Sequence, residues 1–316
     1  MNWTLFLTRR LAALVAVLLV ASFLVYGLLY LVPGGPMAFL LGSRSGTPEQ
    51  IAAIRHAYRL DDPFLIRYFG WLGDALHGNF GRSLVYQQDV SALMSTRLAT
   101  TGLLVTYSAA LIVVVGVALG LVGALRPGPV DGVISLVTGA ALATPTFVVG
   151  ALLAIVFALG LGWFPVVGPG EGLADRLYHL TLPAIALSLG SAAFLARITR
   201  ASVSSELGRE HVETARARGF SPGHVIRRHV LRNASIPVVT VTGLTVAGLI
   251  AGSVVVENIF ALDGLGSLLV RAILQRDFAV VQGVVLVLVA AFVLVNLLVD
   301  ICCSFIDPRL SAGETT

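Results

Sequence analysis

The sequence predicts an all-α, polytopic membrane protein with six transmembrane helices and both termini in the cytoplasm. Composition points this way, because 57% of the 316 residues are hydrophobic and only 12% are charged, about half the ~25% typical of a soluble domain. The charges are also spaced so that six long runs contain none. This balance excludes an ordinary soluble globule, a disordered chain and a nucleic-acid-binding domain.

Each uncharged run is long enough to cross a bilayer, because about 20 helical residues span the ~30 Å hydrocarbon core. Six such helices could not all be enclosed as core helices in a soluble chain of this size. The third run is the longest and ends in a cluster of Gly and Pro, so we expect one span at Ile134–Leu161, kinked at Pro145. The six runs are Leu11–Val32, Leu98–Leu125, Gly132–Gly170, Leu177–Ala196, Asn233–Val256 and Phe278–Val299.

The arginines predict the orientation of the spans. All 21 basic residues are Arg, and Arg9 and Arg10 precede the first span, which favours a cytoplasmic N-terminus. Six spans then place 12 Arg in cytoplasmic segments, 3 in the two short outer loops and 6 in the long first outer loop. A loop of that length is translocated largely regardless of its charge.

The long outer loop is expected to contain short helices. Thr47, Pro48 and Gln50 suit the N-cap, N1 and N3 positions of a helix over Ile51–Tyr58. Pro63–Leu76 combines aromatic and charged residues in a pattern typical of an amphipathic helix. This second helix has two equally weighted interpretations: a contact with the membrane interface or a partner, or a folded cap that binds nothing.

The cytoplasmic segment Arg197–Ser235 predicts two helices joined by a turn centred on Gly. Glu210–Arg218 favours a short helix, and Gly219 suits the left-handed conformation that closes one. Ser221 and Pro222 have the types found at the N-cap and N1 positions of the helix that would continue into the fifth span.

Small residues lie at the centre of this segment, at Ala215, Ala217 and Gly219. The positive-inside rule or contact with anionic lipid would explain the surrounding arginines, but neither explains the small residues. Because small residues let a backbone approach another surface closely, we predict that this turn inserts into a groove on a cytoplasmic partner.

Glu213–Gly219, with the sequence ETARARG, resembles the EAA loop of bacterial ABC importer permeases, and the wider stretch His211–Pro237 resembles the dipeptide/oligopeptide type. The short N-terminus and large first outer loop are similar to the B-type subunit of the permease pair. His211, Glu213 and Asp263 replace the Tyr, Arg and Pro that many relatives carry. Further blocks resemble the same family, in order along the chain: Leu60–Leu84, Leu195–Val203, Val254–Leu269, Arg276–Gly283 and Asn296–Leu310.

The resemblance implies the fold, location and partners of the chain. The fold would be that of a type I ABC importer permease (MetI-like) in the bacterial inner membrane. Its partners would be a second, C-type permease, two ABC ATPase subunits, an extracytoplasmic substrate-binding protein or lipoprotein, and membrane lipid, with no nucleic acid. The transported substrates would be dipeptides or oligopeptides, although the family also handles glutathione, nickel chelates and some sugars.

The resemblance also implies that this chain holds no cofactor and no catalytic residue. A metal site has no support from the sequence, because the six His are scattered and no CxxC motif or His/Cys cluster occurs. ATP and Mg²⁺ would bind to the partner ATPase subunits, and the absence of Lys from the chain agrees, since a P-loop needs one. The chain would divide into residues 1–32 with the first span, the outer loop 33–97, a permease core 98–310 with its coupling loop 197–235, and a tail 311–316.

By resemblance, eight consecutive residues of the EAA loop would couple this chain to the ATPase. The segment would act as a coupling helix that docks in a groove of the ATPase. Four of its residues carry the role in the family pattern, namely Glu213, Ala215, Arg216 and Gly219, and their close neighbours are Thr214, Ala217, Arg218 and Phe220.

The fifth span is the best candidate for lining the translocation path. Its hydroxyl residues, Thr240, Thr242, Thr245 and Ser253, would face the path, although such hydroxyls in membrane helices more often bond to the carbonyl four residues earlier. Gly248 and Gly252 form a GxxxG pair that permits close helix packing, as do Gly116 and Gly120 in the second span.

Glu257 is the acidic residue near the outer end of the fifth span. A carboxylate there is costly unless it is paired or hydrated. It could line the outer mouth, attract the amino terminus of a peptide, or pair with Arg271 or Arg276, and we favour the ion pair.

Three other functions compete with the importer. A channel or secondary transporter would need ionisable residues at mid-membrane or an inverted repeat, and an intramembrane protease would need a facing nucleophile and base; the sequence shows neither pattern. An assembly scaffold would leave the turn at Gly219 unexplained.

Overall fold

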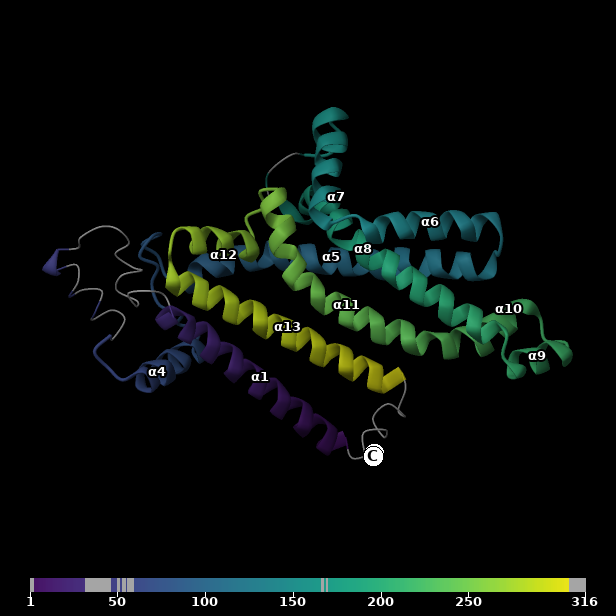
Figure 1. Cartoon of the computed structure of the whole chain (residues 1–316), viewed down its shortest axis with the longest axis horizontal. Coiled ribbons are helices and arrows are strands. Elements are labelled where there is room, and N and C mark those ends of the chain that lie inside the picture. The colour runs from purple at the N-terminus through teal and green to yellow at the C-terminus, as the bar shows by residue number, and fades with distance from the viewer. Residues whose placement is uncertain are drawn as a thin grey trace.

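The computed structural model describes residues 3–31, 47–49, 52, 55, 60–165, 168 and 170–306. Among these residues the regular secondary structure is helical, and one isolated antiparallel bridge joins Arg82 and Asp89. The long helices lie side by side along the long axis of the molecule, with α9 and α10 at one end and α4 and α12 toward the other (Figure 1). The helices are α1 Trp3–Leu31, α4 Phe64–Leu76, α5 Val90–Leu125, α6 Pro129–Ala143, α7 Thr146–Leu153, α8 Gly172–Leu207, α9 Glu210–Ala217, α10 Pro222–Val225, α11 Leu231–Ile259, α12 Leu265–Leu274 and α13 Phe278–Ile306, with π-helical turns η1 Ala154–Gly160 and η2 Ile226–Val230.

The predicted membrane spans are confirmed at five positions. Among the described residues, five helices are long and apolar enough to cross a bilayer, and a bent pair, α6 with α7 and η1, makes up to six. Several spans are longer than the uncharged runs predicted, because the helices continue beyond the membrane-length apolar stretch. The second span extends over Val90–Leu125, and the fourth over Gly172–Leu207.

The third span is not the single kinked helix that the sequence predicted at Ile134–Leu161. The chain breaks there, and Pro129–Ala143 and Thr146–Gly160 meet at 103°. The break lies at Thr144 and Pro145, which both have extended backbone angles, with ψ of 122° and 141°. Proline disfavours the helical conformation of the residue before it and cannot donate its own amide, so the helix ends at this point instead of bending. The α7 arm projects away from the bundle (Figure 1).

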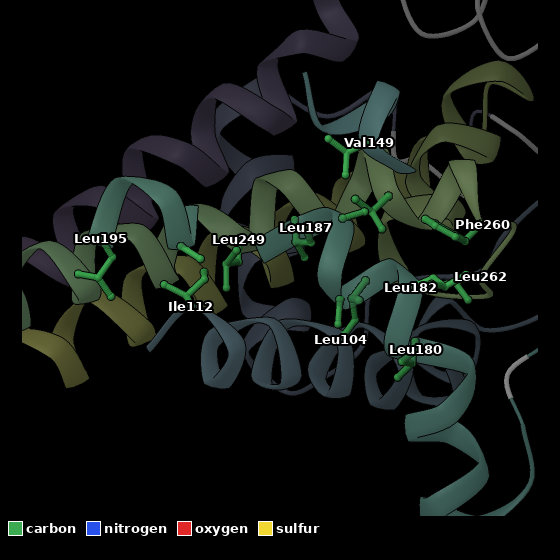
Figure 2. Packing of buried hydrophobic residues seen from close by; sticks show 14 of the residues in the cluster. Leu104, Ile112, Val149, Leu180, Leu182, Leu187, Leu195, Leu249, Phe260 and Leu262 are labelled. Carbon is green, nitrogen blue, oxygen red and sulfur yellow. The ribbon is translucent and has the colours of Figure 1, made fainter. Parts of the chain in front are cut away.

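The tightest helix pair, α5 with α8, is built on the glycines predicted to pack. A Cβ atom on Gly116 would lie 2.9 Å from the Cβ atom of Leu195, and one on Gly120 would lie 2.4 Å from that of Thr199. The two backbones are thus as close as they can be, which confirms a packing role for both glycines. Leu195 of this contact is fully buried, as is Ile112 of α5, and Figure 2 shows these two side chains close together.

The outer loop contains the predicted amphipathic helix as α4. Its buried face centres on Tyr68, whose hydroxyl lies 2.8 Å from that of Ser22 and whose ring packs edge-on against Phe23 of α1. The rest of the helix surface exposes apolar residues, including Ile66 and Phe69. At the other predicted helix start, Thr47 is non-helical and the two residues after it are helical, whereas Gln50 and most of Ile51–Tyr58 lie outside the described residues.

Candidate coupling site and fifth span

The segment that follows α8 folds as the sequence predicted. Helix α9 ends at Ala217, and Gly219 adopts a φ of +78°, in the left-handed region. The amide of Phe220 donates to the carbonyl of Ala215 over 3.3 Å, and the amide of Gly219 donates to that of Arg216 over 2.9 Å. These two bonds form a Schellman motif, which satisfies carbonyls at the end of the helix. Glycine is favoured here because residues with a side chain pay a steric cost for this conformation, and Asn pays the least.

The next helix starts directly after this turn. Ser221 has an extended backbone, and Pro222 occupies the first helical position of α10, where its missing amide costs nothing. Helices α10, η2 and α11 then form one long span from Pro222 to Ile259. The turn is therefore held directly between the fourth span, α8, and the fifth span, α11.

A small apolar core fixes this turn to three long helices. Val212 and Ala215 of α9 are buried against Val203 of α8 and Val230 of η2. Leu121 and Ala124 of α5 pack against the same cluster. Because apolar interiors are close-packed and resist deformation, this core joins α9 firmly to α5, α8 and α11.

The outward face of the turn is exposed. Seven of the eight residues predicted to contact an ATPase are accessible: Glu213, Thr214, Arg216, Ala217, Arg218, Gly219 and Phe220. Ala215 differs, since it is 3% exposed and belongs to the small core. The family pattern placed it among the docking residues, but its position on the inner face of α9 makes it part of the support beneath the docking face.

Aromatic and basic side chains surround the exposed turn. Phe220 is 46% exposed and stacks on the ring of His224, with centroids 5.0 Å apart. A cavity of about 640 Å³ next to it is lined by Arg227, Arg228 and Arg232. This end of the molecule therefore presents an apolar ring framed by positive charge.

The predicted path residues of α11 fall on different faces. Thr240 is exposed, Thr242 and Thr245 are partly buried, and Ser253 is fully buried. All four hydroxyls bond to backbone carbonyls three or four residues earlier in their own helix, at 2.6–3.1 Å. This is the alternative use that the sequence analysis raised for them.

An exposed stripe runs along α11 and contains Thr240. At helical spacing it continues through Leu244, which is 70% exposed, to Gly248, Ala251 and Val255. Because these positions recur every three or four residues, they share one face of the helix. We call this face, Thr240 to Val255, the α11 stripe.

The GxxxG pair of α11 is divided between two surroundings. A Cβ atom on Gly252 would lie 2.8 Å from Leu187 of α8, so this glycine packs against α8. A Cβ atom on Gly248 would meet no described atom within 4 Å, and this glycine lies on the exposed stripe. The predicted packing role thus applies to Gly252 within the chain, and Gly248 would have to pack against a different polypeptide.

Glu257 is enclosed by the protein and does not face an open mouth in this chain. Its side chain is fully buried. Its Oε1 atom accepts a hydrogen bond from the Thr101 hydroxyl over 2.7 Å, and its Oε2 atom accepts one from the Ser267 amide over 2.9 Å. These two hydrogen bonds come from a hydroxyl and an amide, and the ion pairs among the described residues do not include the favoured one with Arg271 or Arg276.

Two ion pairs that the local sequence does not indicate join distant segments of the chain. The Nε and Nη2 atoms of Arg200 donate to the two carboxylate oxygens of Asp131, and these bonds join α8 to the start of α6. At the other end of the bundle, the Arg97 Nε atom donates to Asp263 over 2.9 Å. Each pair joins residues far apart in the sequence, so no local pattern could have indicated it.

Comparison with known proteins identifies the family. Residues 91–312 match the family described as binding-protein-dependent transport system inner membrane component, and residues 3–104 match its N-terminal region. The chain belongs to this family of inner-membrane permeases. The permease is therefore a multi-pass membrane subunit without catalytic activity of its own, and its partners are an ATPase and a binding protein.

Similar curated proteins cover nearly the whole permease. It is 37% identical to a probable peptide ABC transporter permease protein, y4tP, from Sinorhizobium fredii, over 96% of this chain and 98% of that one. It is 35% identical to the oligopeptide transport system permease protein AppB from Bacillus subtilis, over 96% and 98%. Among solved structures, the permease resembles the MetNI methionine ABC transporter, with a TM-score of 0.56 and 21% identity over 68% of this chain and 96% of that chain. An amino acid ABC transporter gives a TM-score of 0.53, with 18% identity over 69% and 94%. These structures show that the fold is that of type I importer permeases.

Proposed function

We propose that the permease forms, with a second and related permease, the membrane path of an ATP-driven importer for dipeptides or oligopeptides. The observation that carries the proposal is the exposed α9 turn on its buried core. It presents small and polar residues outward while its support connects to three long helices. The peptide class is taken from the similar curated proteins, y4tP and AppB, whose names refer to peptides.

The α9 turn docks in a groove of the ATPase with Gly219 at the point of closest approach. A Cβ atom added to Gly219 meets no described atom of this chain within 4 Å, which leaves room in front of it for a partner. Glu213, Arg216 and Arg218 flank it with both signs of charge, and Phe220 supplies an apolar contact. Enclosed aromatic and Arg side chains of this kind commonly dominate binding at protein interfaces.

The second permease covers the α11 stripe, and the path runs between the two chains. The stripe is apolar and small except for Thr240, and Gly248 allows a partner helix to approach closely. Thr242 and Thr245 border it and turn their oxygens toward their own helix. A weakly polar wall of this kind suits passage of varied peptides, because it offers no strong binding group.

The test replaces Gly219 by Asn. Asn tolerates the left-handed conformation better than other residues with a side chain, so the turn is kept while a side chain is added at its tip. In proteoliposomes that contain both permeases, both ATPases and the binding protein, we expect G219N to lower peptide uptake by about tenfold or more, the effect of losing an interface hot spot. ATP hydrolysis should lose its stimulation by the loaded binding protein.

The matched control is G208N. Gly208 caps α8, and a Cβ atom added to it would come no closer than 3.9 Å to any described atom, so it has room for a side chain. Its φ of −91° is not left-handed, and it lies outside the turn. This variant should transport normally. Full coupling by G219N would show that the turn does not dock closely, whereas a wild-type assembly without ligand-stimulated hydrolysis would remove the importer function itself.

A further inference from the structure

A cavity of about 320 Å³ lies where α1, α4 and the start of α13 meet, at the end of the bundle opposite α9. Tyr26 of α1 and Trp71 of α4 form one wall, with ring centroids 5.3 Å apart. Gln282 of α13 also lines the cavity. No residue of α11 is among the described residues that line the cavity, so it is separate from the α11 stripe.

Two buried hydrogen-bond donors in this cavity lack an acceptor among the described residues. Gln282 is only 4% exposed, and neither its Nε2 atom nor the indole Nε1 atom of Trp71 has a hydrogen-bond partner in the part of the chain that the structure describes. Leaving a buried donor unsatisfied costs about 1–3 kcal/mol, and such groups in native proteins usually find a partner. Two of them in one cavity indicate a ligand that brings hydrogen-bond acceptors.

The charges around the cavity define the ligand further. Arg67 and Arg82 both line it, and the Arg82 Nη2 atom also donates to the carbonyl of Gln87 over 3.0 Å. Asp74 supplies a carboxylate on the α4 side. Positive groups and neutral donors beside one acid fit a zwitterion, with an oxyanion held by the donors and an ammonium group held by Asp74.

The surroundings distinguish a lipid from a soluble zwitterion. On the same two helices, Leu24 of α1 is 60% exposed, and Leu65 and Phe69 of α4 are 56% and 63% exposed. Because α1 is long and apolar enough to span the membrane, its exposed side chains would contact hydrocarbon. A headgroup in the cavity would thus have its acyl chains next to an apolar surface, and Tyr and Trp are typical of this depth in a bilayer.

We propose that this cavity binds the headgroup of a phosphatidylethanolamine molecule from the outer leaflet. Trp71 and Gln282 donate to the phosphodiester oxygens, the two arginines add positive charge, and Asp74 accepts from the ethanolamine ammonium. The bound lipid fastens α4 to α1 and α13, and so fixes the outer loop against the membrane spans.

Native mass spectrometry of the purified, delipidated transporter tests the proposal, with phosphatidylethanolamine or phosphatidylglycerol added back. We expect W71F and Q282M each to weaken binding of both lipids at one site by about tenfold, because each removes a charge-assisted hydrogen bond. D74N should lower the preference for phosphatidylethanolamine and leave phosphatidylglycerol binding nearly unchanged. If one variant fails to fold, the others still decide the question.

The matched controls are W163F and Q275M, which change the same residue types at exposed positions away from the cavity. They should bind both lipids as the wild type does. Equal lipid binding by W71F, Q282M and their controls would overturn the proposal. Displacement of the lipid by millimolar inorganic phosphate or by dialanine would also overturn it, since the site would then belong to a soluble ligand.

Discussion

Replacing Glu257 by Gln separates a structural role for this residue from a role in the path. The carboxylate accepts two hydrogen bonds, one at each oxygen, from Thr101 over 2.7 Å and from Ser267 over 2.9 Å. The hydroxyl oxygen of Thr101 in turn accepts a hydrogen bond from the amide of Leu265 over 2.8 Å. These hydrogen bonds join α5, α11 and the start of α12. Removing one of them should therefore lower the free energy of unfolding.

The size of the effect follows from the number of acceptors. Gln has one oxygen, so one of the two donors loses its acceptor in either orientation of the amide, which costs about 2 kcal/mol. Ala removes both acceptors and leaves a cavity, which costs about 4 kcal/mol. For a chain of this length, we expect the melting temperature to fall by roughly 4 °C for E257Q and by about twice that for E257A.

The assay is thermal unfolding of the purified transporter, followed by tryptophan fluorescence, with peptide uptake measured well below the transition. The control is E171Q, at an exposed position before α8, which should leave the melting temperature unchanged. An E257Q protein with wild-type stability and a specific loss of uptake would refute this reasoning and place the carboxylate in the path.

Three further substitutions test the packing of the permease. G120V should destabilise the permease by about 3 kcal/mol in unfolding assays, because a Cβ atom at this position would lie 2.4 Å from the Cβ atom of Thr199. By contrast, G248V should leave the unfolding of the isolated chain unchanged and should lower peptide uptake by the assembled pair of permeases. D277N should cost about 2 kcal/mol and speed proteolysis of the outer loop, because Asp277 is buried and accepts from the equally buried Ser83; equal digestion rates would contradict this. D131N should lower the melting temperature slightly, by less at high salt, and a salt-independent loss would count against the ion pair with Arg200.

Local sequence patterns predicted the coupling turn well. The short helix, the left-handed Gly219 and the start at Pro222 each depend on the conformational preferences of residues within one turn of each other. The spans were predictable for a similar reason, since length and hydropathy decide whether a helix can cross a membrane. Ala215 shows the limit of a family pattern, which marks a position without telling which way its side chain points.

Contacts between distant residues could not be read from the sequence. The partners of Glu257 come from a helix 156 residues earlier and from a backbone amide, and a search for charged partners could not find them. Proline at position 145 indicated a disturbed helix, but the 103° angle depends on what each half packs against. The packing of Gly252 and the exposure of Gly248 likewise depend on which helix lies beside each face.

The packing contacts connect the short helix α9 to most of the permease. The small core beneath α9 includes side chains from α5, α8 and η2. The close contacts at Gly116 and Gly120 fix the register of α5 against α8, because sliding would bring larger side chains to these positions. The ion pair between Asp131 and Arg200 adds α6 to this packed unit of α5, α8, α9 and η2.

Helix α11 continues directly from η2 and carries the α11 stripe. Under the proposed docking, a displacement at Gly219 would therefore reach the proposed path through the continuous backbone as well as through packing. Close-packed interiors of this kind pass between discrete arrangements more readily than they deform. Rotation of this packed unit as a whole is therefore the motion that an ATPase bound at α9 would drive.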